Sequence, residues 1–475
     1  MKNINTITKT LLLFAMPLSN ALAATIVVTT AADSGNGSLR DAVKNAATAD
    51  VVIFNIPKSS TGYDAKSNKW KITLTNGEIE FDRSLTINGG GKIILDGNKK
   101  NRIFGDANRK NEDLSAIYKK ANHLTLEGLV LQNGKADKHN KPYGGAVHAS
   151  IISATKCTFI ENSASEDCGG AIDASTITIK DCTFTGNTAK WGGAIDANGK
   201  DLVCSFTDCV FSNNKAELYG GAVNGSICET VKNSKFINNT AEFGGAMSVM
   251  GYINAIGCVF SGNTTTEPFL TAGIRVSFNN TEIVPGSGSA LLVDGPIIAA
   301  NCSFTGNNTG NSRSGAIHAT DYVYLYHSTV ADNNGKGIQI HSTDGSPILY
   351  AYNSIIVGNS KTPQIGYDKK NGVAAFFNIP KTTSILPNWY INGDCLVEGI
   401  NDVTREKVFG NSRAINGIIT PRLNSIAYKT ATPLIESKIK VHSGMTKNIL
   451  ITELKKDITG ASRYTTGDVN YGAKE

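Results

Sequence analysis

The sequence predicts an all-β protein whose chain winds as a right-handed, single-stranded parallel β-helix. Two motifs that recur in step predict this fold. The first is Cys/Ser-x-Phe-x-x-Asn, and its six clear copies begin at Cys157, Cys182, Cys209, Ser234, Cys258 and Cys302. The second is Gly-Gly-Ala followed by an apolar residue, and its copies begin at Gly144, Gly169, Gly192, Gly220 and Gly244. The first five copies of the first motif start 25, 27, 25 and 24 residues apart, and a fixed period of this length indicates a solenoid or a propeller.

The pattern inside one period decides between these two architectures. Each period holds three short runs in which apolar and polar residues alternate, which is typical of strands buried on one face. In the run Thr176–Lys180, for example, Ile177 and Ile179 alternate with threonine and lysine. A period of this length is too short for a propeller blade, which needs four strands, and no helical periodicity accompanies it. We therefore predict three strands per turn of a β-helix.

Stacked turns should place equivalent side chains over one another, about 4.8 Å apart. The sequence predicts an internal aromatic column made of Phe159, Phe184, Phe211, Phe236, Phe260 and Phe304. Aliphatic columns are predicted to run from Val147 and from Ile152 through the corresponding residues of later turns. The asparagine that ends each first motif is expected at a sharp turn. There it would adopt a left-handed backbone and bond its counterpart in the next turn.

The chain on either side of the repeats is predicted to export and seal the solenoid. Lys2 and Lys9 precede an apolar run that ends at Ala21-Leu22-Ala23, a pattern typical of a cleaved secretory signal. A cap should follow, because an open solenoid end exposes strand edges and core. Its expected elements are a helix at Ser38–Ala47 between strands at Thr25–Thr30 and Val51–Ile56.

The predicted organisation therefore has four parts. These are a signal peptide at 1–23, an N-terminal cap at 24–60, a β-helix at 61–360, and an irregular C-terminal cap or attachment region at 361–475. The clear repeats span 120–360, and an insertion at 264–288 is expected to loop out of one turn.

Composition narrows the class of function. The net charge is +6 and charged residues make up 18% of the chain, a balance that argues against a nucleic-acid partner. No later run approaches about 18 apolar residues, so no transmembrane segment is predicted. We expect a secreted or cell-surface protein, delivered by its signal peptide.

Nine cysteines occur in the chain, and most of them belong to the first motif. Those cysteines share the side of the strand that carries the inward phenylalanine, so they are predicted to be buried and unreactive. Cys204 and Cys228 are the best candidates for a disulfide between neighbouring turns, although stacking alone does not guarantee the required geometry. No Cys-x-x-Cys spacing supports a metal site.

The tandem Phe-x-x-Asn and Gly-Gly-Ala-Ile motifs resemble the repeats of the chlamydial polymorphic outer-membrane protein family. They are also similar to bacterial right-handed β-helix proteins, whose fold is the pectin-lyase-like solenoid. Gly37 to Ala42 and the ending Asp468-Val469-Asn470-Tyr471-Gly472-Ala473 resemble the two ends of such exported proteins. The chlamydial proteins are autotransporters that finish in a membrane barrel. The present sequence shows no series of alternating ten-residue segments before Glu475, so the barrel is not expected here.

Function is expected on the outward face of the strand that follows each Gly-Gly pair. Ligand-binding candidates there are His148, Asp173, Asp196, Asn198 and Asn224. Hydroxyls, amides and carboxylates in a flat array suit a glycan or a calcium ion. Alternation along a strand would by itself make this face polar, and that interpretation stays open. No cofactor is predicted; if a metal binds, the oxygen ligands favour Ca²⁺.

Asp173 and Asp196 are also the catalytic candidates. Neighbouring turns would hold them about 5 Å apart, a separation used by retaining glycosidases. Two carboxylates this close would raise the pKa of one of them, as a general acid requires. The equivalent positions of other turns hold His, Asn, Ser or Leu, which indicates a permissive surface position instead.

A second candidate surface precedes the Gly-Gly pairs. Tyr143, Trp191, Tyr219 and Phe243 occupy equivalent positions there and would form an aromatic column along one edge. Such a column would stack against sugars or contact a protein, or it would simply shield the turns.

These observations favour an exported adhesin or interaction module that binds an extracellular glycan or a surface protein. The alternative is a secreted polysaccharide lyase or glycoside hydrolase centred on Asp173 and Asp196. A purely structural component of the cell envelope is the third hypothesis. Fold alone does not choose among them.

Overall fold

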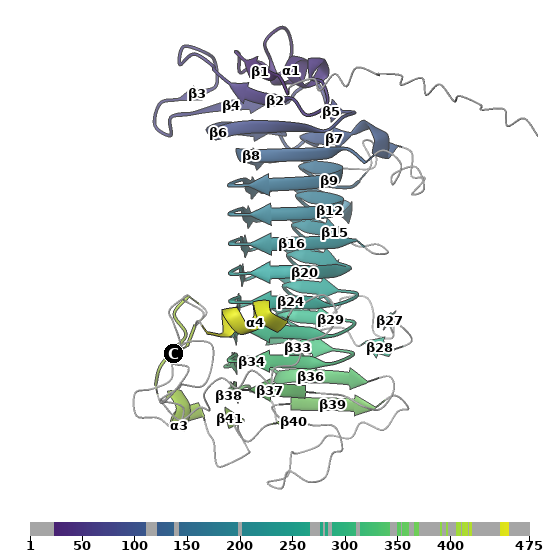
Figure 1. Cartoon of the computed structure of the whole chain (residues 1–475), viewed down its shortest axis with the longest axis vertical. Coiled ribbons are helices and arrows are strands. Elements are labelled where there is room, and N and C mark those ends of the chain that lie inside the picture. Colours follow the sequence, from purple (N-terminus) through teal and green to yellow (C-terminus); the bar gives the residue numbers. More distant parts are fainter. Residues whose placement is uncertain are drawn as a thin grey trace, which may run out of the picture.

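The repeated motifs fold into successive turns of a parallel β-solenoid with about 11 turns (Figure 1). The structure is a computed structural model. It describes residues 23–110, 121–136, 142–197, 202–266, 276–278, 281–283, 287–309, 314–342, 349–352, 354–360, 365–369, 390–391, 396–397, 405–409, 411–416, 418–419 and 447–455. The predicted fold class is confirmed. The predicted signal peptide lies almost entirely outside the described residues.

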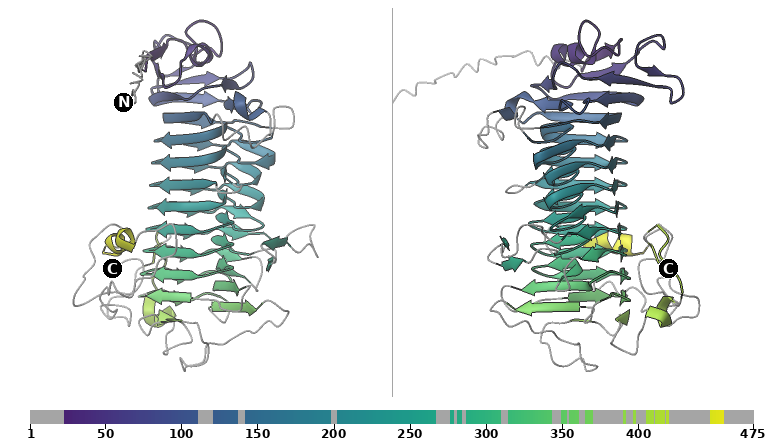
Figure 2. Two further views of the ribbon diagram at one scale, coloured as in Figure 1. Left: turned by 45° about the vertical axis from the view of Figure 1, so that its right-hand side comes forward. Right: turned by 180° about the vertical axis from the view of Figure 1, so that it is seen from behind.

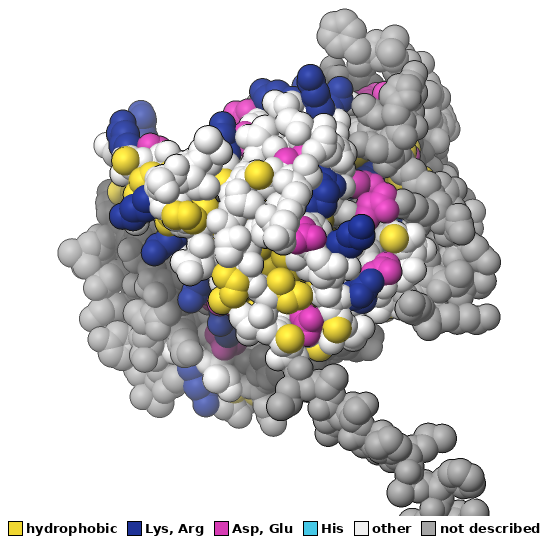
Figure 3. Space-filling model, turned by 90° about the horizontal axis from the view of Figure 1, so that it is seen from above, with side chains coloured by type: hydrophobic (Ala, Val, Ile, Leu, Met, Phe, Trp, Pro, Cys, Tyr) yellow, Lys and Arg dark blue, Asp and Glu magenta, His cyan; other side chains and the backbone are white. Residues whose placement is uncertain are grey.

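The N-terminal end is closed by a helix between two strands. Strand β1 (Thr25–Val28) pairs in parallel with β2 (Val51–Phe54), and α1 (Leu39–Asn45) connects them. Ser38 caps this helix by accepting a hydrogen bond from the backbone of Asp41. Apolar residues of α1 join the main core, as their helical spacing predicts. Viewed from above, the hydrophobic side chains of the described residues at this end form only small separate groups (Figure 3).

The first turns are less regular than the later ones. They contain β3 (Tyr63–Asp64), β4 (Lys69–Thr73), β5 (Ile79–Phe81), β6 (Leu85–Asp96), β7 (Phe104–Asp106), the 3₁₀ helix η1 (Ala107–Lys110) and β8 (His123–Gln132). The strand β9 (Val147–Thr155) begins the regular repeats.

The regular turns form four ladders of parallel strands. Three of them are the predicted strands of each turn, and the fourth is a short ladder after the asparagine that the sequence did not predict. The phenylalanine ladder runs through β10 (Thr158–Ile160), β13 (Thr183–Thr185), β17 (Val210–Ser212), β21 (Lys235–Ile237), β25 (Val259–Ser261), β31 (Ser303–Thr305), β35 (Thr329–Ala331), β38 (Ile355–Val357) and β41 (Leu396–Val397). A short second ladder consists of β11 (Ser163–Cys168), β14 (Thr188–Trp191), β18 (Lys215–Tyr219), β22 (Thr240–Ala241), β26 (Thr264–Thr265) and β32 (Asn308–Thr309).

The third and fourth ladders follow the Gly-Gly pairs. In β9 and β12 (Ile172–Lys180) one continuous strand serves both. The third ladder then runs through β15 (Ile195–Ala197), β19 (Val223–Gly225), β23 (Met247–Val249), β29 (Leu291–Val293), β33 (Gly315–Ala319), β36 (Lys336–Ser342) and β39 (Ile365–Lys369). The fourth runs through β16 (Val203–Thr207), β20 (Ile227–Lys232), β24 (Ile253–Ile256), β30 (Ile297–Ala300), β34 (Val323–Tyr326), β37 (Leu349–Tyr352) and β40 (Tyr390–Ile391).

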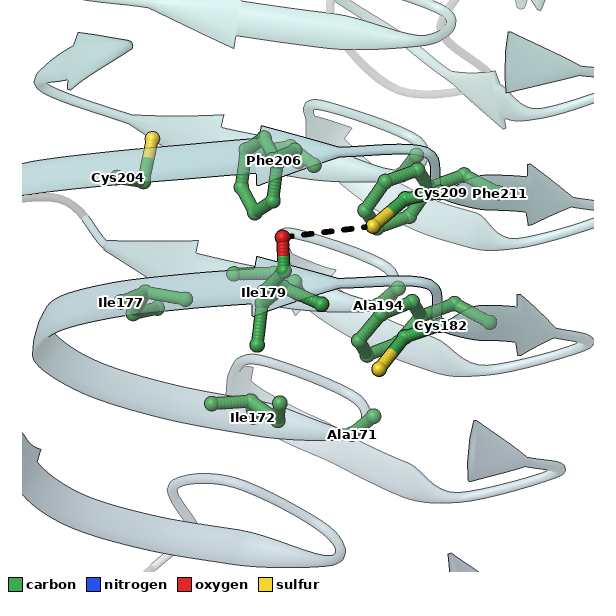
Figure 4. Packing of buried hydrophobic residues seen from close by; sticks show 14 of the residues in the cluster. Ala171, Ile172, Ile177, Ile179, Cys182, Ala194, Cys204, Phe206, Cys209 and Phe211 are labelled. Carbon is green, nitrogen blue, oxygen red and sulfur yellow. Dashed lines mark hydrogen bonds between the residues drawn. The ribbon is translucent and has the colours of Figure 1, made fainter. Parts of the chain in front are cut away.

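The aromatic column fills the interior as predicted. Phe184 and Phe211 stack with ring centroids 4.8 Å apart and planes 8° from parallel. The other neighbouring pairs from Phe159 to Phe304 lie 4.6 to 4.9 Å apart. The aliphatic residues surround these rings, together with cysteine thiols such as that of Cys209 (Figure 4). Register therefore stacks phenylalanine on phenylalanine from Phe159 to Phe304.

The asparagine ladder confirms one half of its prediction and corrects the other. Asn187 Nδ2 donates to Asn214 Oδ1 at 2.9 Å, and the backbone N of Asn187 donates to the same oxygen at 3.0 Å. The left-handed backbone, however, belongs to the residue before each asparagine, such as Asn213 with φ +56°. The ladder asparagines are themselves buried, because their amides replace the main-chain bonds that the sharp turn breaks.

The predicted insertion contains a separate hairpin. Strands β27 (Val276–Phe278) and β28 (Thr281–Ile283) pair with each other in antiparallel fashion, and they project from the side of the solenoid (Figure 2). Thr264 and Thr265, at the start of the predicted insertion, remain in the second ladder as β26.

The C-terminal helices pack beside the solenoid. The helix α3 (Arg405–Phe409) places Val408 and Phe409 against Ile355 and Val357. The helix α4 (Lys447–Leu454) lies beside the fourth ladder near β30 (Figure 1). Strands β39, β40 and β41 continue three ladders past residue 360, where the β-helix was predicted to end. The described helices of 361–475 cover a flank of the solenoid.

Candidate functional site

The Gly-Gly turn positions both candidate surfaces. Gly192 has φ +64°, and a Cβ there would lie 2.1 Å from the carbonyl oxygen of Ile195. A Cβ on Gly193 would lie 2.1 Å from the carbonyl oxygen of Gly221. Only glycine fits either position. The five Gly-Gly pairs therefore give five similar turns, which stack the residues before and after them into two columns.

The column after the turn is the predicted polar strip. Register pairs its members in the order His148, Asp173, Asp196, Asn224, Ser248, Leu292 and His318. Asp173 and Asp196 are direct register partners, as the stacking of turns predicts. Asn198, the remaining candidate of this strip, lies outside the described residues.

The expectation that this strip faces solvent is wrong for its described candidates. His148 is 5% exposed, Asp173 8%, Asp196 3% and Asn224 4%. Their side chains do point away from the core, but neighbouring groups cover them. The ring of Tyr143 stacks on the His148 imidazole with centroids 5.5 Å apart, and Arg109 from η1 reaches over the same position. Alternation along a strand specifies direction but not what lies above it.

Asp173 is the centre of a buried ionic cluster. Its Oδ2 lies 2.7 Å from His148 Nδ1 and 3.3 Å from Arg109 Nη1. Arg109 Nη1 also donates to the carbonyl oxygen of Ala149 at 2.6 Å. The side chain of Asp173 is therefore held from two sides, and its carboxylate carries a neutralising partner.

The pKa values in this cluster follow from burial and the arginine charge. Burial lowers the pKa of His148 to about 4, although the hydrogen bond and charge of Asp173 oppose this. Burial would raise the pKa of Asp173, but Arg109 and the His148 hydrogen bond outweigh it and lower that pKa. At neutral pH the pair is therefore an aspartate and a neutral imidazole, with the Nδ1 proton directed at the carboxylate.

Asp196 and Cys168 complete the surroundings of Asp173. Asn224 Nδ2 donates to Asp196 Oδ1 at 2.6 Å. Cys168 Sγ donates to Asp167 Oδ1 at 2.8 Å. Burial raises the pKa of the Cys168 thiol, and the negative charges of Asp196 and Asp173 raise it further. Cys168 therefore stays a thiol, which is a poor nucleophile.

This geometry does not support the enzymatic hypothesis. A glycosidase acid needs an accessible carboxyl group whose pKa is raised. Asp173 is buried, and Arg109 helps to lower its pKa. Asp196 is also buried and bonded to Asn224. The arrangement stabilises the outer layer of two turns and presents no proton donor to a substrate at Asp173.

Metal binding has no built site among the described residues. No group of three or more His, Cys, Asp or Glu side chains there is arranged to hold an ion. One carboxylate oxygen of Asp173 and one of Asp196 are instead engaged by protein groups. Calcium binding at this strip has no supporting observation.

The column before the turn retains partial exposure. Tyr143, Cys168, Trp191, Tyr219 and Phe243 follow one another along it, and we call these five residues the turn ridge. Tyr143, Trp191 and Tyr219 are half-buried, whereas Phe243 is buried and packs with Leu292. The ridge therefore both shields the turns and leaves aromatic surface in contact with solvent.

Contacts along the ridge set its chemistry. Lys190 Nζ lies 4.7 Å from the centroid of the Trp191 ring, and the rings of Tyr219 and Phe243 stack at 5.0 Å. Burial raises the pKa of Tyr219 to about 12, with a further contribution from Glu242. Its hydroxyl is thus protonated at neutral pH. Flat rings, a cation and a hydroxyl lie along one edge.

Sequence reasoning missed two members of these surfaces. Cys168 precedes a Gly-Gly pair as the aromatic residues do, so its position was the available signal. Arg109 lies in a segment without repeats, and no pattern in the sequence marks it. Only the folded chain brings Arg109 to Asp173, across 64 residues.

Comparison with known proteins agrees with the repeat. Residues 181–198 and 208–226 match the Chlamydia polymorphic membrane protein repeat, and each match contains both motifs. No curated protein and no solved structure matches the chain significantly. Among the described residues, no helix has the length and apolar character needed to span a bilayer. The repeat and the fold together indicate a surface-associated protein. The chain is a parallel β-solenoid protein that carries Chlamydia polymorphic membrane protein repeats.

Proposed function

We propose that this protein is an exported interaction module of the cell surface that binds an extracellular glycan through the turn ridge. The observation that carries the proposal is the alignment of three half-buried aromatic residues, Tyr143, Trp191 and Tyr219, along one edge of the solenoid, with Cys168 in the turn between Tyr143 and Trp191. Aromatic faces stack against the apolar faces of sugar rings, while their polar tips bond hydroxyls.

The spacing of the ridge suits an extended chain ligand. Turns repeat about every 4.8 Å, and Trp191 and Tyr219 are direct register partners. Successive units of one glycan chain would therefore meet successive turns. The nearby Lys190 ammonium adds a charged donor beside the indole ring. The polar strip supports the ridge from beneath through the Tyr143–His148 stack.

The test is binding of the full chain to an immobilised panel of neutral and acidic glycans, followed by titration of any glycan that binds. Trp191→Ala should weaken binding about fivefold, because one stacked ring contributes about 1 kcal/mol. Tyr219→Ala should act in the same direction. Tyr252→Ala is the matched control, since Tyr252 is a half-buried tyrosine at another corner of the solenoid.

Two results would overturn the proposal. One is a panel without any binding by chain that is folded according to circular dichroism. The other is glycan binding that Trp191→Ala leaves unchanged. If the chain captured a defined surface protein and Trp191→Ala abolished that capture, the ligand of the ridge would be a protein and not a glycan.

A further inference from the structure

The fourth ladder contains two thiols in direct contact. Cys204 and Cys228 are register partners on β16 and β20, and their Sγ atoms lie 2.8 Å apart. Both side chains are buried. Cys204 projects into the core beside Phe206 (Figure 4). In the structure both residues are free cysteines.

The residue types around this pair set it apart. The rest of its column is aliphatic and consists of Leu124, Ile152, Ile177, Ile253, Ile297, Val323 and Leu349. Two successive positions carry cysteine where the other turns carry a branched side chain. The cysteines of the first motif differ from this pair, because serine occupies the same position at Ser234 and its hydroxyl makes the same hydrogen bond as the thiol. Cys209 Sγ and Ser234 Oγ each donate to the carbonyl oxygen two residues earlier.

The neighbouring turn residue leaves room for sulfur. Gly225 pairs with Ala197 on one side and Val249 on the other, so glycine replaces a larger residue at this level. A Cβ on Gly225 would lie 3.3 Å from the Sγ atoms of both cysteines, closer than ordinary packing allows. The register of β16 and β20 also shifts directly after Cys204. The backbone at this pair therefore departs from the regular register of the other turns.

We propose that Cys204 and Cys228 form a disulfide that joins neighbouring turns of the solenoid when the chain folds in an oxidising compartment. The two sulfurs must approach from 2.8 Å to about 2.05 Å. Each thiol loses one hydrogen as the S–S bond forms. An exchange disulfide takes up the two electrons and two protons, its own S–S bond breaks, and two thiols are released.

Burial determines when this reaction occurs. The pair is inaccessible in the folded chain, and burial raises the pKa of Cys204 well above its usual value. Exchange requires a thiolate and access. The bond should therefore form during folding, and afterwards the folded solenoid should protect it from reductants.

The test refolds the full chain with a mixture of reduced and oxidised glutathione, and separately with reductant alone. Oxidised chain that is alkylated after unfolding should carry two fewer blocked thiols than reduced chain. Its mass before alkylation should be lower by two hydrogen atoms. The midpoint of urea unfolding should be higher for the oxidised form, because the bond restricts the unfolded chain.

The sequence allows the bond to be located. Trypsin cleaves after Lys200, Lys215 and Lys232, so Cys204 and Cys209 fall in the peptide Asp201–Lys215 and Cys228 falls in Ala216–Lys232. These two peptides should be linked, and fragmentation should place the link on Cys204. Cys204→Ser should abolish it. Cys209→Ser is the matched control and should retain it, since serine is native to the corresponding position of the next turn.

Three results would overturn the proposal. The first is folded chain that keeps every thiol after oxidative refolding. The second is a link that fragmentation of the wild-type peptides places on Cys209. The third is a bond that forms but is reduced as readily in the folded chain as in urea. Localisation on wild-type peptides keeps the test decisive if Cys204→Ser does not fold.

Discussion

The outer face of the fourth ladder differs between the early and the late turns. In β12 the outward residues Thr176, Thr178 and Lys180 are exposed. In β30 the corresponding residues Ile298 and Ala300 are fully buried. The same scaffold therefore presents a polar face in its early turns and an apolar one in its late turns.

The C-terminal helix α4 explains this difference. Leu450, Ile451 and Leu454 pack against Ile298 and Ala300. Lys232 Nζ pairs with Glu453 Oε1 at 2.8 Å, and Asn301 Nδ2 donates to the carbonyl oxygen of Glu453 at 2.8 Å. Alternation fails in β30 because both faces of the strand are buried, one by the core and one by the helix. A strand without alternation thus marks where another element docks.

The outer face of the early turns is covered by other kinds of side chain than the outer face of the late turns. Above the polar strip the cover is ionic and aromatic, through Arg109 and Tyr143. Above β30 the cover is aliphatic. These two kinds of cover should respond to different perturbations, since protonation breaks the first and loss of apolar area breaks the second.

The largest expected effect concerns the core that both regions share. Phe211→Ala removes one ring from the continuous column and leaves a cavity between Phe184 and Phe236. We expect the free energy of unfolding to fall by about 4 kcal/mol. Urea denaturation followed by circular dichroism measures this loss. Ser212→Ala, at the outward position beside it, should change stability by less than about 0.5 kcal/mol. A loss below about 1 kcal/mol for Phe211→Ala would contradict a shared packed column.

Acid should weaken the ionic cover of the early turns. The pKa of His148 is lowered from 6.5 to about 4 in the folded chain, so between these values the unfolded chain binds the additional proton. Stability should therefore fall as pH drops from about 6.5 to 4, by roughly 3 kcal/mol in total. Asp173 keeps its charge through this window because its pKa is lowered too.

The measurement is urea denaturation at several pH values between 7 and 4, with His148→Gln beside the wild type. Glutamine does not titrate, so the variant should lose less stability than the wild type over the same range. Equal losses in both proteins would show that other groups carry the acid sensitivity.

Loss of apolar contact area should weaken the packing of α4 on the late turns. Leu450→Ala removes a buried side chain from the contact with the outer face of the late turns. We expect α4 to become less stable against local opening by about 2 kcal/mol. Hydrogen exchange in the peptide that contains Lys447–Leu454 should accelerate accordingly, while exchange in β12 stays unchanged.

Thr178→Ala on the exposed face of β12 is the control for that experiment. It removes a methyl and a hydroxyl group from a face that solvent covers, so stability should change by less than about 0.5 kcal/mol. Unaltered exchange in Leu450→Ala would mean that α4 is held by its polar contacts through Glu453.

The repeats and their inward residues were predictable from the sequence because they depend only on local periodicity. A strand has a side-chain period of two, and a turn that returns every 25 residues or so forces like residues into register. Phe184 and Phe211 therefore stack as expected. The Gly-Gly turns followed from the same argument, since a Cβ on Gly192 would collide with the chain.

The tertiary structure decided what covers the outside of the solenoid. The sequence around Asp173 does not indicate that Arg109 contacts it. The sequence around Ile298 does not indicate that Leu450 packs against it. These contacts join segments that are far apart in sequence, and one partner of each contact lies outside the repeats. The repeat pattern therefore cannot predict them. The sequence by itself determined the column of the core, because stacking propagates one local pattern. Only the folded chain determined which outward side chains remain free to meet a ligand, because exposure depends on everything that packs above a residue.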